Sequence, residues 1–178
     1  MPEAGALQIA PLTEADLPAY KSLRDHALRH HEEAFPSDAA TEALRTAQSY
    51  HARLGSRGDD SNAGGFSLGA WRGDRLVGAI TCERDARTKV RHVGHIVGMM
   101  VTTDEQGQGV GRALLAALIA RASADAELHQ LTLSVTSSNE RAVRMYERAG
   151  FTSYGSLPRA IRVAGRFFDK QLMHLELQ

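Results

Sequence analysis

The sequence predicts a mixed α/β domain in which a central, mostly antiparallel sheet is covered by helices. Two apolar runs flank a short Gly- and Asp-containing turn at residues 72–75, and a third run ends at Val101. Such a succession is typical of antiparallel strands joined by tight turns. A glycine-rich turn and an Ala- and Leu-rich helical segment follow the third run. A second strand-like run, at 131–135, again leads into a helical segment, so strands and helices alternate in the second half of the chain.

The first third of the chain predicts one strand and two helices. Residues 7–11 read as a short strand, and Thr13 is expected to cap a helix that runs to about residue 31. A second helix is expected from Asp38 to about residue 54, followed by a loop at 55–65 that is rich in Gly, Ser and Asp. The apolar side of the first helix is expected to comprise Leu17, Tyr20, Leu23 and Leu28.

The remaining strands surround two helices. Helices are predicted at 112–122 and from about Asn139 to Gly150, where a glycine suits the left-handed residue that ends a helix. The strands are expected at 66–71, 76–83, 90–101, 131–135, 151–154 and 171–177, with polar connections at 85–89, 157–159 and 165–169.

The segment Gln-Gly-Gln-Gly-Val-Gly at 106–111 separates a strand from a helix. A turn of this kind directs backbone N–H groups and the positive end of a helix dipole to one point, where a phosphate binds. No Lys follows the glycines, which excludes a Walker motif, and glycines spaced by two do not fit G-x-G-x-x-G. The alternative interpretation of this segment, taken alone, is an ordinary strand-to-helix turn with surplus glycine.

Gln106, Gly109 and Gly111 fit the spacing [QR]-x-x-G-x-[GA], and here the chain resembles the GNAT superfamily of acyl-CoA-dependent N-acetyltransferases. The segment from Asn139 to Phe151 is similar to the family's second signature, N-x-x-A-x-x-x-Y-x-x-x-G-F. Two ordered motifs are far more specific than one, and the resemblance covers about residues 66–177. It implies one GNAT-like domain over residues 1–178, a length that suits a single core. The implied fold has three layers: a central, mostly antiparallel sheet with a splayed parallel strand pair, and helices on both faces.

The resemblance also implies acetyl-CoA as the co-substrate. Its pyrophosphate would lie on the backbone amides of the turn, and its pantetheine arm would pair with a bulged central strand where that strand splays from its parallel neighbour. The Val101 N–H is the candidate for polarising the thioester carbonyl, and Asn139 is a candidate for bonding the arm while capping its helix. The cofactor-binding residues are therefore expected to be Met99, Met100, Val101, Gln106, Gly107, Gln108, Gly109, Val110, Gly111, Arg112 and Asn139.

Tyr146 occupies the tyrosine position of the second signature and is the candidate general acid. A phenol is protonated at neutral pH and can give its proton to a leaving thiolate. From helical spacing alone, Tyr146 would instead be an aromatic residue on the buried side of an amphipathic helix. His95 is the candidate base, because it stands where some protein-acetylating relatives carry a catalytic Glu. His92, Glu83 and a chain of waters remain alternatives.

The expected reaction is direct attack of an amine on the thioester in a ternary complex. A ping-pong route through Cys82 is disfavoured, since a lone cysteine in an apolar strand is usually inert packing. Two other classes of function remain open: a non-catalytic acyl-CoA-binding sensor or scaffold, and a nucleotide-binding protein. The resemblance places Glu32, Glu33 and Asp38 over the acceptor pocket, where they suit a cationic amine, whereas Arg159, Arg162 and Arg166 near the other rim suit an anion. The acceptor, a small molecule or a protein, is therefore left open.

The amino-acid composition limits the classes of partner and the cellular location that the sequence predicts. Lys and Arg total 21, as do Asp and Glu, so the formal net charge is zero, which argues against a nucleic-acid or anionic-membrane binder. A single cysteine permits no intrachain disulfide and no Cys-based zinc site, and no metal is expected. The absence of a ~20-residue apolar run and of a signal-peptide pattern makes a cytoplasmic location the expectation. GNAT-like domains often pair through their C-terminal strands, so a homodimer is implied as an option.

Overall fold

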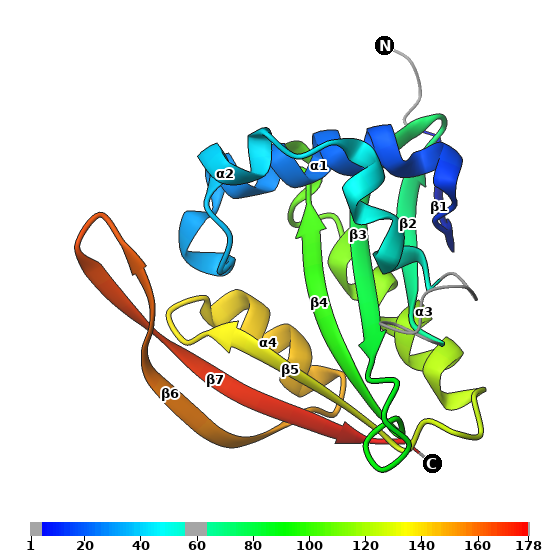
Figure 1. The fold of residues 1–178 in the computed structure, drawn as a ribbon, viewed down its shortest axis with the longest axis vertical. Helices are drawn as coiled ribbons and strands as arrows, with labels where there is room; N and C mark the ends of the chain where they lie inside the picture. Colours follow the sequence, from blue (N-terminus) through cyan, green and yellow to red (C-terminus); the bar gives the residue numbers. More distant parts are fainter. Residues whose placement is uncertain (1–4, 56–63, 178) are drawn as a thin grey trace.

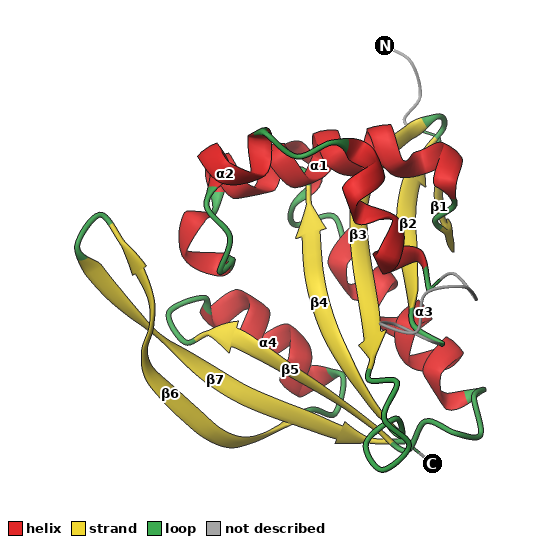
Figure 2. Cartoon of the chain, viewed as in Figure 1, coloured by secondary structure: helices red, strands yellow, loops and turns green. Residues whose placement is uncertain are grey.

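The structure, a computed structural model, describes residues 5–55 and 64–177, and most of the loop expected at 55–65 lies outside these residues (Figure 1). Within them, seven strands form one sheet in the spatial order β1-β2-β3-β4-β5-β7-β6 (Figure 2). All neighbours are antiparallel except β4 and β5. The strands are β1 (Leu7–Pro11), β2 (Phe66–Arg72), β3 (Arg75–Arg84), β4 (Val93–Val101), β5 (Gln130–Thr136), β6 (Thr152–Val163) and β7 (Arg166–Glu176).

Helices cover both faces of the sheet, as the sequence predicts (Figure 1). The α-helices are α1 (Leu17–His30), α2 (Ala39–Ala43), α3 (Val110–Ser123) and α4 (Glu140–Arg148). In residues 5–55 and 64–177 they are accompanied by the short 3-10 helices η1 (Glu14–Asp16), η2 (Glu32–Ala34), η3 (Ala47–Leu54) and η5 (Thr103–Glu105). None of the helices in the described part of the chain is long and apolar enough to cross a membrane.

Strand β3 is buried on both faces because it lies in the middle of the sheet. Ala79 packs with α1 and η3 in one apolar cluster, whereas its neighbour Ile80 packs with α3 in the other, and both are fully buried. This position explains why β3 reads as a nearly continuous apolar run. The four residues predicted to form the apolar side of α1 are all buried.

The parallel pair is short and splayed. Only three residue pairs join β4 to β5, namely Val93–Gln130, Gly94–Leu131 and His95–Thr132. Beyond them the strands diverge in a V (Figure 1). On the other edge of β4, two residues, Gly98 and Met99, lie opposite the single residue Ile80 of β3. This β-bulge places Gly98 at a φ of +60°, where glycine is favoured. The predicted fold class is confirmed.

The single helix predicted from Asp38 to residue 54 is wrong. The Asp38 carboxylate does cap a helix, accepting the Thr41 N–H at 2.8 Å, but α2 ends at Ala43. Thr46 is extended, and η3 begins after it. The Ser49 hydroxyl donates to the Thr46 carbonyl at 2.7 Å, and such local bonds of Ser and Thr offer the backbone an alternative to a continuous α-helix.

The strands predicted at 151–154 and 171–177 are too short, because β6 and β7 form a hairpin of 12 and 11 residues. Residues 152–159 of β6 are exposed, so no apolar alternation marks them as a strand. The register shifts between Leu157 and Ile161, around Arg159 with its φ of +53°. The hairpin reaches beyond the helices, and the homodimer through this region stays a prediction (Figure 1).

Two smaller differences concern element ends. The strand expected from residue 90 begins at Val93, and residues 90–92 belong to the preceding turn. The capping arrangement expected at Thr13 leads into η1 before α1 starts. There the Asp16 carboxylate accepts both the N–H and the hydroxyl of Thr13, each at 2.8 Å.

Candidate active site

The glycine-rich turn leaves the start of α3 open. Gly107 and Gly109 adopt φ values of +88° and +82°, which other residues rarely accept. Gly109 is the N-cap, so it provides no capping side chain, and the first helical bond runs from the Ala113 N–H to the Gly109 carbonyl at 2.9 Å. The N–H groups of the first turn, at 110–112, therefore point out of the helix without a side-chain acceptor from the described residues, at the positive end of its dipole.

Two arginines flank this turn. A Cβ placed on Gly107 would lie 3.4 Å from Nη2 of Arg141, and one on Gly109 would lie 3.7 Å from Nη2 of Arg112. Guanidinium groups beside free backbone N–H groups suit a phosphate or pyrophosphate. Arg112 was predicted as part of the turn. Arg141 of α4 was not, although it stands two residues after Asn139 in the second motif.

The third glycine brings α3 close to β4 and α4. A Cβ on Gly111 would lie 3.4 Å from the Met145 Sδ, 3.5 Å from the Met99 Cε and 3.8 Å from Val101. Met99 and Val101 thus pack on the α3 side of the sheet, whereas Met100 is buried in the α1 cluster. Both methionine side chains take part in core packing, and this stretch borders the gap between β4 and β5.

The backbone of Val101 faces that gap. The Thr102 N–H donates to the Val77 carbonyl of β3 at 2.9 Å. Because successive residues of a strand direct their polar groups to opposite edges, the N–H and carbonyl of Val101 point away from β3. The Val101 carbonyl accepts from Nε2 of Gln106 at 3.4 Å, and the same Nε2 lies 2.9 Å from Nε2 of His31. Gln106 therefore ties the turn to β4 and to the end of α1.

The two motif residues of α4 lie at its start and on its buried side. Oδ1 of Asn139 accepts the Ala142 N–H at 3.2 Å and caps the helix, while Nδ2 has no recorded partner among the described residues. Tyr146 is 6% exposed and packs edge-on against Phe151, with ring centroids 5.8 Å apart. Burial raises the pKa of Tyr146 to about 12. Tyr146 thus has the position of a core aromatic residue, and its phenol is firmly protonated.

The candidate bases fall into two groups. His95 lies between Glu83 of β3 and Thr132 of β5, and pairs in register with both. Nδ1 of His95 lies 2.7 Å from the Thr132 hydroxyl, which leaves Nε2 for other partners. His92 lies apart from them, in the turn before β4, where its ring packs against His129. The structure therefore brings Glu83 and His95 together on the α1 face, where β4 and β5 begin to separate.

A cation that the sequence did not reveal lies over the bulge. Nη1 of Arg53, at the end of η3, donates to the Tyr20 hydroxyl at 3.2 Å, and Nε is 4.0 Å from the Glu83 carboxylate. A Cβ on Gly98 would lie only 2.6 Å from Nη1 of Arg53. Burial opposes the charge of Arg53, but Tyr20 and Glu83 outweigh it and raise the pKa above its ordinary value. We call Tyr20, Arg53, Glu83 and Gly98 the bulge cluster.

The charged residues expected near the acceptor are only partly brought together. Glu32, Glu33 and Arg166 line a cavity of about 330 Å³ between the end of α1 and the tip of the β6–β7 hairpin. Asp38 caps α2 instead. Arg159 and Arg162 stack over the ring of Phe167, at 5.2 and 5.7 Å from its centroid.

Cys82 is not available as a nucleophile. Cys82 is fully buried, and burial raises the pKa of its thiol to about 11, so it is a poor nucleophile at neutral pH. Within residues 5–55 and 64–177, no three His, Cys, Asp or Glu side chains converge to hold a metal.

The sequence and the fold were compared with those of known proteins. The model of the acetyltransferase (GNAT) family matches residues 21–151. Over 77 residues, 43% of the chain, the sequence is 36% identical to the L-methionine sulfoximine/L-methionine sulfone acetyltransferase of Pseudomonas aeruginosa, of which the match covers 44%. It is 31% identical over 162 residues to the mycothiol acetyltransferase of Actinosynnema mirum, covering 85% of this chain and 49% of that one. The chain thus spans about half the length of these curated relatives.

The fold is shared with solved structures. yncA of Salmonella typhimurium, solved with its cofactor acetyl-CoA, superimposes with a TM-score of 0.83 over 98% of this chain and 95% of that one, at 23% identity. At this level of identity the likeness concerns the fold alone.

Proposed function

Since the chain belongs to the acetyltransferase (GNAT) family, we propose that it transfers an acetyl group from acetyl-CoA to a primary amine of a small molecule or protein. The observation that carries the proposal is the uncapped glycine turn at the start of α3, directly beside the open edge of β4. A phosphate cradle next to an unpaired strand edge suits a ligand with a pyrophosphate at one end and an amide-bearing arm at the other.

In this proposal the pyrophosphate lies on the backbone N–H groups of the turn, with Arg112 and Arg141 beside it. A Cβ on Gly109 would lie 3.7 Å from the Arg112 guanidinium, and a Cβ on Gly107 would lie 3.4 Å from that of Arg141. The pantetheine arm pairs with β4 along Met99, Met100 and Val101, in the gap that the splayed strands leave. The free amide nitrogen of Asn139 supplies a further donor to the arm from the start of α4.

The chemistry is a direct displacement. The acceptor reaches the site as an ammonium ion and first loses a proton, through water or directly, to His95 or Glu83. The neutral nitrogen attacks the thioester carbonyl carbon, and the developing oxyanion accepts a hydrogen bond from the Val101 N–H. The nitrogen then gives up its second proton to water, the C–S bond breaks, and the CoA sulfur leaves as a thiolate near Tyr146.

The high pKa of Tyr146 defines its part in this step. A phenol with a pKa of about 12 is a weaker acid than an ordinary thiol, whose pKa is ~8.5. Tyr146 therefore stabilises the thiolate chiefly by donating a hydrogen bond, and transfers the proton to the extent that the dry site also raises the thiol pKa. The presence of both Tyr146 and a base favours a catalyst over a non-catalytic acyl-CoA-binding module.

Calorimetric titration with acetyl-CoA, CoA, ATP and NAD tests the proposal. We expect acetyl-CoA and CoA to bind, and ATP and NAD to leave the protein unaffected. A folded sample that ignores CoA would rule out the acetyltransferase assignment, and binding of ATP or NAD would assign the turn to a nucleotide instead. A screen of amines for CoA-thiol release then separates an enzyme, which releases CoA, from a binding module, which does not.

A further inference from the structure

The bulge cluster presents a cation and an anion side by side, next to the segment of β4 where the thioester would lie. We propose that Arg53 binds the carboxylate of the acceptor while Glu83 receives its ammonium group. The acceptor is then an α-amino acid or a comparably short amino carboxylate. The inference rests on the proposed acetyl transfer and assigns the acceptor side of the same site.

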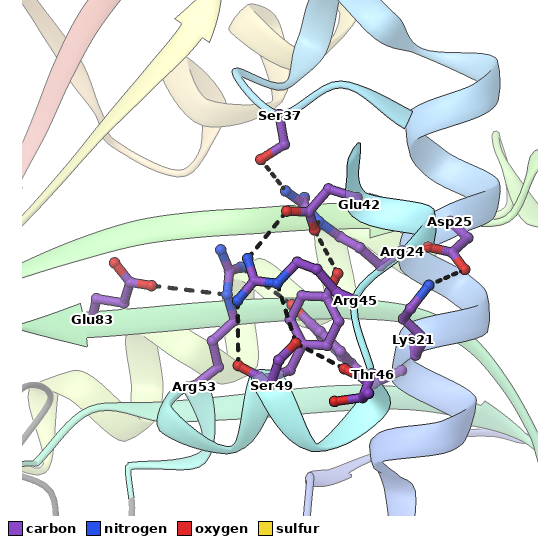
Figure 3. A network of polar contacts seen from close by, with 12 residues as sticks. Lys21, Arg24, Asp25, Ser37, Glu42, Arg45, Thr46, Ser49, Arg53 and Glu83 are labelled. Atoms are coloured by element: carbon purple, nitrogen blue, oxygen red, sulfur yellow. Dashed lines mark hydrogen bonds and ion pairs between the residues drawn. The ribbon is translucent and has the colours of Figure 1, made fainter. Parts of the chain in front are cut away.

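The position of Arg53 is fixed by a polar network behind it (Figure 3). Glu42 of α2 lies 3.7 Å from Nε of Arg24, and accepts from the Tyr50 hydroxyl at 2.5 Å. The Tyr50 ring packs edge-on against Tyr20, which in turn accepts from Arg53. This network holds η3 against α1, and η3 carries Arg53 over the bulge. A prepositioned guanidinium loses little conformational freedom when it binds an anion.

Arg53 has binding capacity that its protein partners do not use. Its contact with Glu83, at 4.0 Å, is at the limit of an ion pair, and both side chains reach solvent, with exposed fractions of 24% and 41%. Such a long and partly exposed ion pair contributes little to stability. Among the described residues, Nη2 of Arg53 has no recorded partner. A guanidinium prefers bidentate carboxylate bonds, and a zwitterion could separate Arg53 from Glu83 while satisfying each.

The location suits the reaction. Arg53 lies against Gly98, and the next residue, Met99, contributes backbone to the gap between β4 and β5. His95, three residues before Gly98, is about 10 Å away along the strand, and pairs in register with Glu83. A carboxylate on Arg53 would therefore hold the α-amine, one carbon away, beside Glu83, whose strand neighbour is His95.

The cavity lined by Glu32, Glu33 and Arg166 also combines opposite charges. Arg166, however, is exposed and stacks over Phe168 at the tip of the hairpin, whereas Arg53 touches the bulge itself. Arg166 is thus the rival arginine: if it bound the carboxylate, its loss would remove the preference for amino acids, whereas the present proposal expects the preference to remain.

The experiment compares acceptors that differ only in the carboxylate. L-Phenylalanine is paired with 2-phenylethylamine, and L-leucine with 3-methylbutylamine, and kcat/KM is measured by CoA release for the wild type and for Arg53→Gln, Arg53→Lys and Arg166→Gln. We expect the wild type to prefer the amino acids, and Arg53→Gln to lower kcat/KM for them about 10- to 100-fold, as expected for lost charge-assisted bonds. For the amines, Arg53→Gln should change kcat/KM by less than about 3-fold. Arg53→Lys should fall between, and Arg166→Gln should keep the preference.

Several outcomes would overturn the assignment. The assignment fails if the wild type has equal kcat/KM values for the amines and the amino acids. It also fails if Arg53→Gln lowers kcat/KM equally for both kinds of substrate, as the loss of a merely structural residue would. If no CoA release is detected, calorimetry measures the binding of the same amino acids to the CoA-loaded protein. A wild-type protein that binds none of them rejects the inference. Acetyl-CoA titration of each variant keeps the two proposals apart, since a protein that binds acetyl-CoA but shows no carboxylate preference loses only the acceptor assignment.

Discussion

Helices α3 and α4 follow the two strands of the splayed pair, yet they begin in opposite ways. The N-terminus of α3 has a glycine cap and exposes its N–H groups, whereas the side chain of Asn139 caps α4. A side-chain cap typically stabilises a helix by about 1 kcal/mol, so α3 forgoes a contribution that α4 keeps. Under the proposed function, the open end of α3 would bind a ligand oxygen with its own N–H groups, whereas α4 would contribute the side chains of Tyr146 and Arg141.

The most direct way to break the contrast is to give α3 a cap of its own. Gly109→Asp should place a carboxylate where the pyrophosphate would lie, which removes charge-assisted bonds and adds repulsion. We expect acetyl-CoA affinity to fall about 1000-fold, equivalent to about 4 kcal/mol, as measured by calorimetry. Gly73→Asp, at another positive φ with open space around it, is the control for backbone strain and should bind normally. Retained binding in Gly109→Asp would contradict the open-end interpretation.

Tyr146→Phe tests the side-chain contribution of α4. Loss of the phenol should lower kcat about 100-fold, the lower range for a general acid, while acetyl-CoA affinity stays within about 3-fold. The readout is steady-state CoA release combined with calorimetry. Tyr154→Phe removes the hydroxyl of an exposed tyrosine on β6 and should leave kcat unchanged. A Tyr146→Phe enzyme with normal kcat would restrict Tyr146 to packing.

The same tyrosine should mark alkaline unfolding. Its pKa is about 12 in the folded protein and ~10 in the unfolded chain. Between these values the unfolded chain releases the proton and the folded protein keeps it, so the free energy of unfolding falls as pH rises. The loss approaches about 2.7 kcal/mol by pH 12 and is absent below pH ~9. Urea unfolding at pH 9, 10 and 11 should show a steeper decline for the wild type than for Tyr146→Phe. Parallel declines would show that the phenol ionises equally in both states.

Asn139 separates capping from ligand binding. Asn139→Ala should lower the free energy of unfolding by about 1 kcal/mol and weaken acetyl-CoA binding a few-fold. Asn139→Asp retains the capping oxygen but replaces the free amide nitrogen, so it should keep the stability and weaken only the binding. Urea unfolding and calorimetry on both variants provide the test. Unchanged acetyl-CoA affinity in both would limit Asn139 to its cap.

The parts of the site that the sequence predicts are those formed by a continuous stretch of backbone. The glycine spacing at 107, 109 and 111 determines the turn, and Asn139 and Tyr146 occupy fixed positions in one helix. Arg53, Gly98 and Arg141 escaped prediction because their roles arise only when distant segments meet. Gly98 gave a signal nonetheless, since a glycine within an apolar strand often marks a bulge.

The errors in the fold have a common cause. The apolar residues of β2 to β5 identify these strands in the sequence, because each strand packs at least one face against helices. The hairpin of β6 and β7 has too little burial to show a pattern, and it was predicted as two short strands. Between Arg45 and Ser49, local side-chain bonds prevented the continuous helix that composition favoured.

The short pairing between the parallel strands β4 and β5 couples ligand binding to the stability of the folded protein. Within the sheet only three residue pairs join β4 to β5, so an acyl-CoA arm lying in the gap would act as an additional strand between them. A ligand that binds only the folded chain stabilises it by RT ln(1 + [L]/Kd), about 2.7 kcal/mol at 100 times Kd. We therefore expect amide hydrogen exchange in β4 and β5 beyond His95 and Thr132 to slow when acetyl-CoA binds. The concentration of acetyl-CoA would then determine how much of the protein stays folded, as well as the rate of the proposed reaction.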